Sequence, residues 1–135
     1  MSDYIEIPDE LPEGWPTDWS GNTVINCGEH GSFCLEVGTE GHPSRVHIDN
    51  YREILRRWPE LWPQVHAVLS DMLASWEYDY PIRNPGASLD MRLPPEPITE
   101  GVQWGVGAKF YHGKGQWDVV FDGWTVVPDE SQPYF

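Results

Sequence analysis

The stretch NYREILRRWPELWPQVHAVLSDMLASWEYDY, residues 50–80, decides how the rest of this chain must be arranged. Its apolar residues recur at steps of three and four, the spacing that places side chains on one face of an α-helix. They are Tyr51, Ile54, Leu55, Trp58, Val65, Val68, Leu69, Met72, Leu73 and Trp76. A helix that is apolar along one side has to cover another element. The group from Leu69 to Trp76 is therefore predicted to be buried against a sheet.

Two prolines divide this stretch into two parts. A proline inside a helix costs about 3 kcal/mol, because it has no N–H to donate and its ring crowds the preceding turn. Proline is comfortable only in a first turn, which makes Pro59 or Pro63 the start of a new helix. The sequence thus predicts two consecutive helices, 50–58 and 60–77, within a helical region that spans 49–80.

Residues 88–127 carry the clearest strand pattern in the chain. From Val102 to Phe110, and again from Trp117 to Phe121, every second residue is apolar, as in strands with one buried face. Turns at HGKG (112–115) and at Asp122–Gly123, a type I′ signal, predict an antiparallel meander. The predicted register pairs Phe110 with Trp117, Lys109 with Asp118 and Phe121 with Trp124.

Residues 23–48 are predicted to form three more strands. These are Thr23–Cys27, Ser32–Gly38 and Arg45–Ile48. A GEHG turn at 28–31 pairs Cys27 with Ser32 and places Cys34 diagonally from Cys27, about 7–8 Å away between Cα atoms. That separation is too large for a disulfide, so two free thiols are expected.

The whole chain, 1–135, is predicted to be a single α+β domain with the element order βββ-αα-ββββ. Its sheet is mostly antiparallel and carries both helices on one face; two separate small sheets are the alternative. Residues 1–22, rich in Pro, Trp and acidic residues, are expected to form an arm along the domain.

Charge is the most informative functional feature of the sequence. The net charge is −14, and residues 1–44 hold nine carboxylates without a single Lys or Arg. Such a field repels nucleic acid and anionic membranes and attracts basic partners, although solubility alone would also explain it. The basic cluster of Arg52, Arg56 and Arg57 is predicted to pair internally with some of the surplus acid.

The N-terminus and the hydropathy pattern suggest a compartment. The first residues, MSDYIEIPDE, are acidic and lack the basic and apolar regions of a secretory signal. No apolar run approaches the roughly 20 residues of a membrane span. A soluble, cytoplasmic protein is therefore expected, and its oligomeric state is left open.

Two segments resemble known proteins in their arrangement. PELWPQVHAVLSDMLASWEYDY followed by GQWDVVFDGWTVV resembles the layout of small acidic bacterial domains of uncharacterised function, some associated with toxin-immunity proteins. The resemblance covers roughly residues 45–127 and rests on the order of the elements. It implies a role in binding another protein and assigns no active-site residue.

Few residues suggest chemistry. Cys27, His30 and Cys34 are candidate metal ligands, with His42 and His47 nearby, but Cys-x2-His-x3-Cys on one hairpin is not a familiar zinc clamp. A catalytic Cys–His dyad would need a third group to orient its base. The prediction is therefore no metal and no cofactor, with packed thiols and a turn histidine instead.

Three functional hypotheses follow. The favoured one is a non-enzymatic acidic protein that binds a basic macromolecular partner, in the manner of an immunity protein, through Asp9, Glu10, Glu13, Trp15, Asp18 and Trp19. The second is a small-ligand or carbohydrate-binding domain that uses exposed Trp15, Trp19 or Trp62, because sugar rings stack on aromatic faces. An enzyme without a legible motif comes third. A concave pocket lined by Trp and carboxylates would favour the second or third, and a flat acidic face the first.

Overall fold

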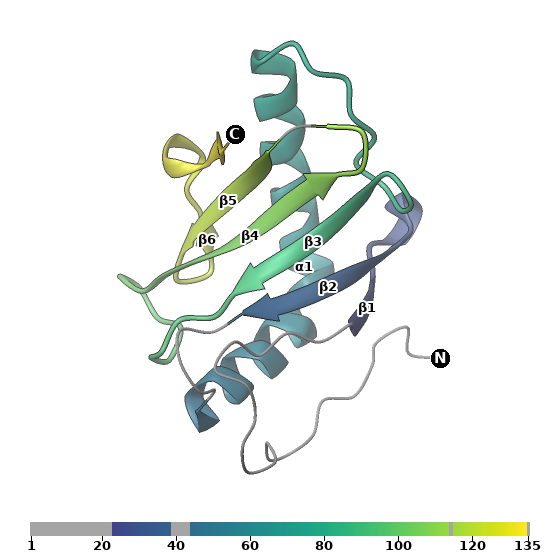
Figure 1. Cartoon of the computed structure of the whole chain (residues 1–135). Helices are drawn as coiled ribbons and strands as arrows, with labels where there is room; N and C mark the ends of the chain where they lie inside the picture. The colour runs from purple at the N-terminus through teal and green to yellow at the C-terminus, as the bar shows by residue number, and fades with distance from the viewer. Residues whose placement is uncertain (1–22, 39–43, 114, 135) are drawn as a thin grey trace.

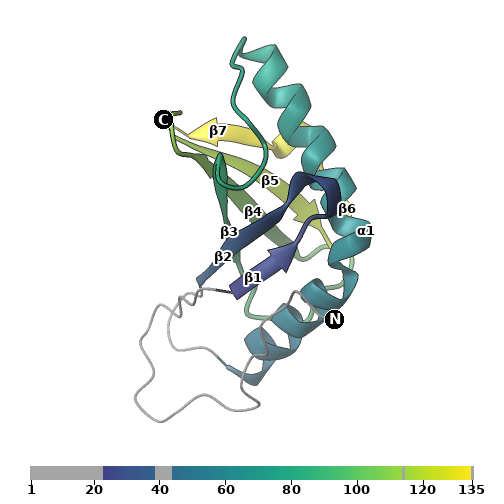
Figure 2. The same ribbon diagram turned by 90° about the vertical axis from the view of Figure 1, so that its right-hand side faces the viewer.

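The structure is a computed structural model that describes residues 23–38, 44–113 and 115–134. These residues form the predicted α+β fold, with a helix against one face of a twisted sheet (Figures 1 and 2). The elements in chain order are β1 (Thr23–Asn26), η1 (Gly28–His30), β2 (Ser32–Gly38), α1 (Arg45–Ser75), β3 (Ala87–Arg92), β4 (Gln103–Phe110), β5 (Gln116–Asp122), β6 (Thr125–Val126), η2 (Pro128–Glu130) and β7 (Gln132–Tyr134).

All described strands belong to one sheet. Their order is β1-β2-β3-β4-β5-β6, and β7 pairs with β5 as well. Neighbouring strands are antiparallel except β2 and β3, which are parallel because the chain crosses over through α1 between them. The sheet is therefore mostly antiparallel, as predicted, and the alternative of two separate small sheets is wrong.

The described residues contain one α-helix where two consecutive helices were predicted. α1 runs from Arg45 to Ser75 and includes both Pro59 and Pro63. Both prolines are exposed, so neither ring occupies the packed face of the helix. The first turns run at an angle to the rest of the helix (Figures 1 and 2), as expected where prolines bend a helix without ending it.

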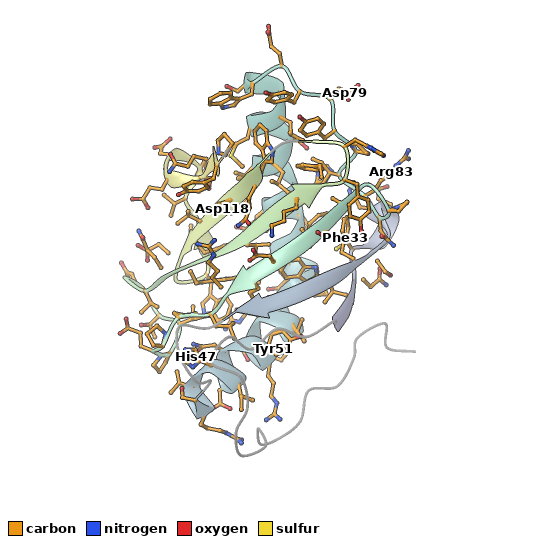
Figure 3. The ribbon with its side chains drawn as sticks, viewed as in Figure 1. Phe33, His47, Tyr51, Asp79, Arg83 and Asp118 are labelled. Atoms are coloured by element: carbon orange, nitrogen blue, oxygen red, sulfur yellow. The ribbon has the colours of Figure 1, made fainter. Side chains whose placement is uncertain are left out.

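The start of α1 replaces the strand predicted at Arg45–Ile48. Ser44 precedes the helix, and its backbone N–H donates to His47 Nδ1 at 2.9 Å. His47 and Tyr51, both buried, lie on this first part of the helix (Figure 3). The alternation of Val46 and Ile48 covers too few residues to distinguish a strand from a helical turn.

Asn50 lies in the second turn of α1 and is buried. Its side-chain amide donates to the carbonyl groups of Pro94 (3.3 Å) and Glu96 (2.8 Å), and its oxygen accepts the backbone N–H of Ile98 at 3.3 Å. One side chain thus satisfies three backbone groups of the connection between β3 and β4.

The meander has the predicted strands in a different register. Ala108 pairs with Trp117, Gly107 with Asp118 and Trp104 with Phe121, so Phe110 is not opposite Trp117 and Lys109 is not opposite Asp118. The shift is two residues, which leaves every side chain on its predicted face because strand side chains alternate with a period of two. The loop around HGKG is accordingly wider than a tight turn.

The next hairpin also turns one residue later than predicted. Asp122 pairs with Thr125 and Phe121 with Val126, so Phe121 is not opposite Trp124. Gly123 and Trp124 are the loop residues, and only Gly123 has a positive φ, 58°. A positive φ at the first loop position alone is typical of a type II′ turn, which favours glycine there.

The core lies between α1 and the sheet. Leu69 and Leu73 of the helix are buried, as predicted, together with Trp117, Val119 and Phe121 of β5. Met72 is only partly buried, and Trp76 is 52% exposed, which contradicts its predicted burial. The apolar spacing does not predict the position of the Trp76 side chain, because α1 ends at Ser75 and Trp76 no longer follows the helical period.

Candidate functional site

The predicted binding residues of the N-terminal arm lie outside the described residues. Asp9, Glu10, Glu13, Trp15, Asp18 and Trp19 all fall within 1–22. Their part in binding a partner stays a prediction.

The first hairpin differs from its predicted register by one residue. Asn26 pairs with Ser32 and Val24 with Cys34, whereas the predicted register paired Cys27 with Ser32. The reason is a three-residue 3-10 turn, η1, between the strands, closed by a hydrogen bond from the Cys27 backbone N–H to the Gly31 carbonyl at 2.8 Å. Cys27 is a free thiol, as predicted, while the side chain of Cys34 lies outside what the structure describes. The diagonal arrangement offered as the reason is wrong.

The Cys27 thiol is unsuited to nucleophilic chemistry. It is buried and accepts a hydrogen bond from Trp58 Nε1 at 3.4 Å. Burial raises its pKa to about 12, against the smaller lowering effect of that hydrogen bond, so the thiolate is scarce at neutral pH. Within the described ranges, no three His, Cys, Asp or Glu side chains form a group that could hold a metal ion.

A histidine pair joins η1 to α1. The rings of His30 and His66 are stacked with centroids 4.0 Å apart, and Trp62 meets each of them at 5.8 Å in an edge-on arrangement. These three residues line a concavity of about 510 Å³, together with Glu29 at its rim. The sequence could not indicate this pair, because His30 and His66 are far apart in the chain and belong to different elements.

The histidine pair sits in a weakly charged environment. Glu29 Oε1 lies 3.6 Å from His30 Nε2, and Arg83 lines an adjoining concavity that also contacts both histidines (Figure 3). The pKa of His66 is lowered, mainly by burial and then by the nearby His30. At neutral pH, His66 is therefore an uncharged ring that can accept or donate a hydrogen bond.

Trp62 is buried and not the surface aromatic residue that the sequence suggested. It is 4% exposed and packs against Phe33, with ring centroids 5.3 Å apart, and against Trp58 at 6.0 Å. It forms the floor of the concavity beside the histidines. With 4% of its surface exposed, its ring offers no open face on which a sugar could stack.

A second hollow, which we call the Trp76 groove, lies where the end of α1 meets η2 and β7. Its volume is about 290 Å³, and its lining includes Val68, Asp71, Met72, Trp76, Pro128 and Pro133. Trp76 is anchored by an edge-on contact with the fully buried Trp117, with ring centroids 6.5 Å apart. The groove lining thus contains a half-exposed aromatic ring and one carboxylate, Asp71.

The cations of α1 lie toward the other end of the helix and are paired there. Arg57 Nε donates to Glu53 Oε1 at 2.7 Å, Arg56 also binds Glu53, and Arg45 lies 3.3 Å from Asp49. The two arginines lower the pKa of Glu53 to about 2. The guanidinium group of Arg57 also lies 4.2 Å from the Trp124 ring centroid. Internal pairing of the basic cluster is confirmed for Arg56 and Arg57.

The acidic residues near the C-terminal end of α1 are not paired with a Lys or Arg of the described part of the chain. Asp71, Glu77, Asp79 and Asp129 form no ion pair with any residue in the described part of the chain. Asp79 lies on the connection that follows α1 (Figure 3). No Lys or Arg lines the Trp76 groove. The positive and negative ends of α1 are therefore chemically different surfaces.

The sheet face that α1 leaves uncovered carries charges of both signs. It includes a hollow of about 370 Å³ lined by Arg92, Gly107, Asp118 and Tyr134, among others. Asp118 accepts a hydrogen bond from Gln116 Nε2 at 2.6 Å, and Asp122 accepts the Gly101 backbone N–H at 2.7 Å. Both carboxylates are thus occupied in structural hydrogen bonds.

Comparisons with known proteins identify no relative. No family model matches the chain, and neither the curated proteins nor the solved structures provide a match. Among the described residues, no helix has both the length and the apolarity needed to cross a membrane.

Proposed function

We propose that this protein is a non-enzymatic binding protein whose acidic surface engages a basic macromolecule, in the manner of an immunity protein. The observation that carries this proposal is the segregation of charge along α1. Arg56 and Arg57 both pair with the carboxylate of Glu53 in the first half of the helix, whereas Asp71, Glu77 and Asp79, near its other end, form no ion pair within the described chain.

The rest of the charge distribution supports the same function. The chain carries −14 overall, and residues 1–44 add nine carboxylates to the field and contain no Lys or Arg. Exposed charges of one sign accelerate encounter with an oppositely charged partner and repel nucleic acid. The mixed charges on the uncovered sheet face make that face a weaker candidate.

The test is a selection from a random-peptide display library on the immobilised protein, at low and at high salt. We expect the enriched peptides to be rich in Arg and Lys and to be released by salt, because exposed charge pairs are screened beyond about 8 Å at physiological ionic strength. Selected peptides without basic enrichment would overturn the proposal.

A variant with Asp9→Asn, Glu10→Gln, Glu13→Gln and Asp18→Asn separates the contribution of the N-terminal arm. If the arm takes part, the selected peptides should associate more slowly with this variant and dissociate at nearly the same rate. An unchanged association rate would restrict the binding surface to the rest of the chain.

A small-ligand function is the second candidate, and the concavity beside His30, His66 and Trp62 is what favours it. It combines aromatic walls with imidazole and carboxylate groups, the composition of many small-molecule sites. An NMR fragment screen tests it: a ligand should shift the His66 signals in the wild type and not bind His66→Ala. A screen without such ligands would remove this candidate.

A further inference from the structure

The Trp76 groove has the features of a recognition site for one type of side chain. Its lining includes the anchored, half-exposed indole ring of Trp76, the carboxylate of Asp71 and the apolar side chains of Val68 and Met72. A planar guanidinium group can stack on such a ring and bind a carboxylate with two parallel N–H donors at once. A lysine ammonium group offers the charge but not the flat surface or the paired donors.

The same pairing already occurs within the molecule. The Arg57 guanidinium group lies 4.2 Å over the Trp124 ring while its Nε donates to Glu53. That internal site shows a tryptophan and a carboxylate sharing one arginine. The Trp76 groove offers the equivalent aromatic and acidic partners, and none of its lining residues is a Lys or Arg.

Other hollows fit a basic segment less well. The concavity lined by His30 and His66 contains Glu29, but its indole ring, Trp62, is only 4% exposed and offers no open face. The adjoining hollow includes Arg83, and the hollow on the uncovered sheet face includes Arg92; each of these two places a positive charge close to an incoming arginine, which costs binding energy. Ring exposure and charge complementarity together therefore favour the Trp76 groove.

We infer that the Trp76 groove binds an arginine side chain of an extended, basic segment of the partner, with neighbouring apolar residues of that segment against Met72 and the two prolines. This inference rests on the proposed function and specifies where and through which residue the partner is held. The guanidinium group stacks on Trp76 and pairs with Asp71.

The probe is a fluorescent peptide of alternating Arg and Leu, compared with the same peptide carrying citrulline, an uncharged analogue of arginine, or Lys. Binding is measured by fluorescence polarisation at low salt, and ¹H–¹⁵N spectra locate the contact. We expect shifts in residues 68–76 and 128–133. The arginine peptide should bind more tightly than the lysine peptide, and the citrulline peptide weakest of the three.

Matched variants test the two named contacts. Trp76→Ala and Asp71→Asn should each weaken binding of the arginine peptide about five- to tenfold. Tyr111→Ala removes another exposed aromatic ring, and Glu100→Gln removes an exposed carboxylate outside the groove. Both controls should bind within about twofold of the wild type. Urea unfolding of every variant confirms that the fold is retained.

The outcomes separate this inference from the function on which it rests. Unchanged affinity in Trp76→Ala and Asp71→Asn, equal binding of the citrulline peptide, or no binding of the arginine peptide overturns the groove as the arginine site. If the display selection still yields basic peptides, the acidic protein-binding function stands and the contact lies elsewhere. A selection without basic enrichment overturns both.

Discussion

At the scale of single residues, buried polar groups hold the connections of this fold in place. Asn50 satisfies three backbone groups between Pro94 and Ile98, and Trp104 Nε1 donates to the Gly123 carbonyl at 2.6 Å. Each of these side chains ties a loop to a regular element. Removing one leaves buried backbone groups without partners, which costs more than the hydrogen bond itself contributes.

Asn50→Ala should therefore destabilise the protein by about 1–3 kcal/mol, because the Ile98 N–H and two carbonyl groups lose their partner. Gln103→Ala, which removes an exposed hydrogen bond to Glu130, is the control and should change stability by less than about 0.5 kcal/mol. Urea unfolding measures both. Equal effects would mean that the β3–β4 connection does not depend on Asn50.

The histidines make stability depend on pH. Burial lowers the pKa of His66 and of His47 in the folded state, so the unfolded chain takes up protons more readily. Their contribution to stability is thus present above the unfolded histidine pKa, about 6.5, and is lost as the pH falls toward the lowered folded values. Urea unfolding between neutral and mildly acidic pH should show this loss, and His66→Gln should reduce the slope. An unchanged slope in that variant would contradict the assignment to His66.

At the scale of elements, α1 is continuous because its prolines face solvent. A proline carries its full cost only where the freed carbonyl is buried or the bend disrupts packing. Pro59 and Pro63 are exposed, while Trp58 and Trp62 beside them are buried. The helix can therefore bend around the sheet without losing contact with it.

Pro63→Ala should stabilise the protein by about 1 kcal/mol or more, since it restores a helical hydrogen bond at an exposed position. Pro59→Ala should act in the same direction. Two separate helices would give the opposite result at the proline that opens the second helix, because proline favours a first turn. Urea unfolding distinguishes the two arrangements, and a loss of stability in either variant would contradict the continuous helix.

The packed face of α1 ends before Trp76. Leu69→Ala should cost about 2–5 kcal/mol, as large-to-small changes in a core do. Trp76→Ala should cost much less, about 1 kcal/mol or below, because the ring is half-exposed. Thermal and urea unfolding of the two variants test this order, and similar losses at both sites would show that Trp76 belongs to the core.

At the scale of the whole molecule, excess negative charge opposes the compact state. The net charge of −14 is spread over a chain with only eight Lys and Arg residues. Like charges repel within a Debye length, about 10 Å at 0.1 M salt. Repulsion between the negative charges on the surface therefore lowers the stability of the folded protein. A positively charged partner would relieve this repulsion on binding.

Sodium chloride should raise the melting temperature by screening this repulsion. The triple variant Asp71→Asn, Glu77→Gln, Asp79→Asn should melt higher than the wild type at low salt and respond less to added salt. Sucrose, which stabilises without screening, is the control and should affect both proteins alike. A melting temperature that falls with salt would mean that attractive charge pairs dominate.

The features that depend on local pattern were predictable from the amino-acid sequence. Apolar spacing identified the helix face from Val65 to Leu73, and alternation identified which side of β4 and β5 is buried. The excess of acidic residues predicted that Arg56 and Arg57 pair internally, and their partner, Glu53, lies within about one helical turn of both. Each of these follows from residues close in the chain, whose geometry is fixed by helix or strand periodicity.

The way in which the elements pack against one another depends on contacts between residues far apart in the chain. A two-residue shift between β4 and β5 preserves every buried face, so alternation could not distinguish Ala108 from Phe110 as the partner of Trp117. α1 is continuous through Pro59 and Pro63 because both lie on the side of the helix that faces away from the sheet. The His30–His66 pair and the Trp76 groove arise from residues brought together by packing. These features are set by non-local contacts, which no periodicity along the chain records.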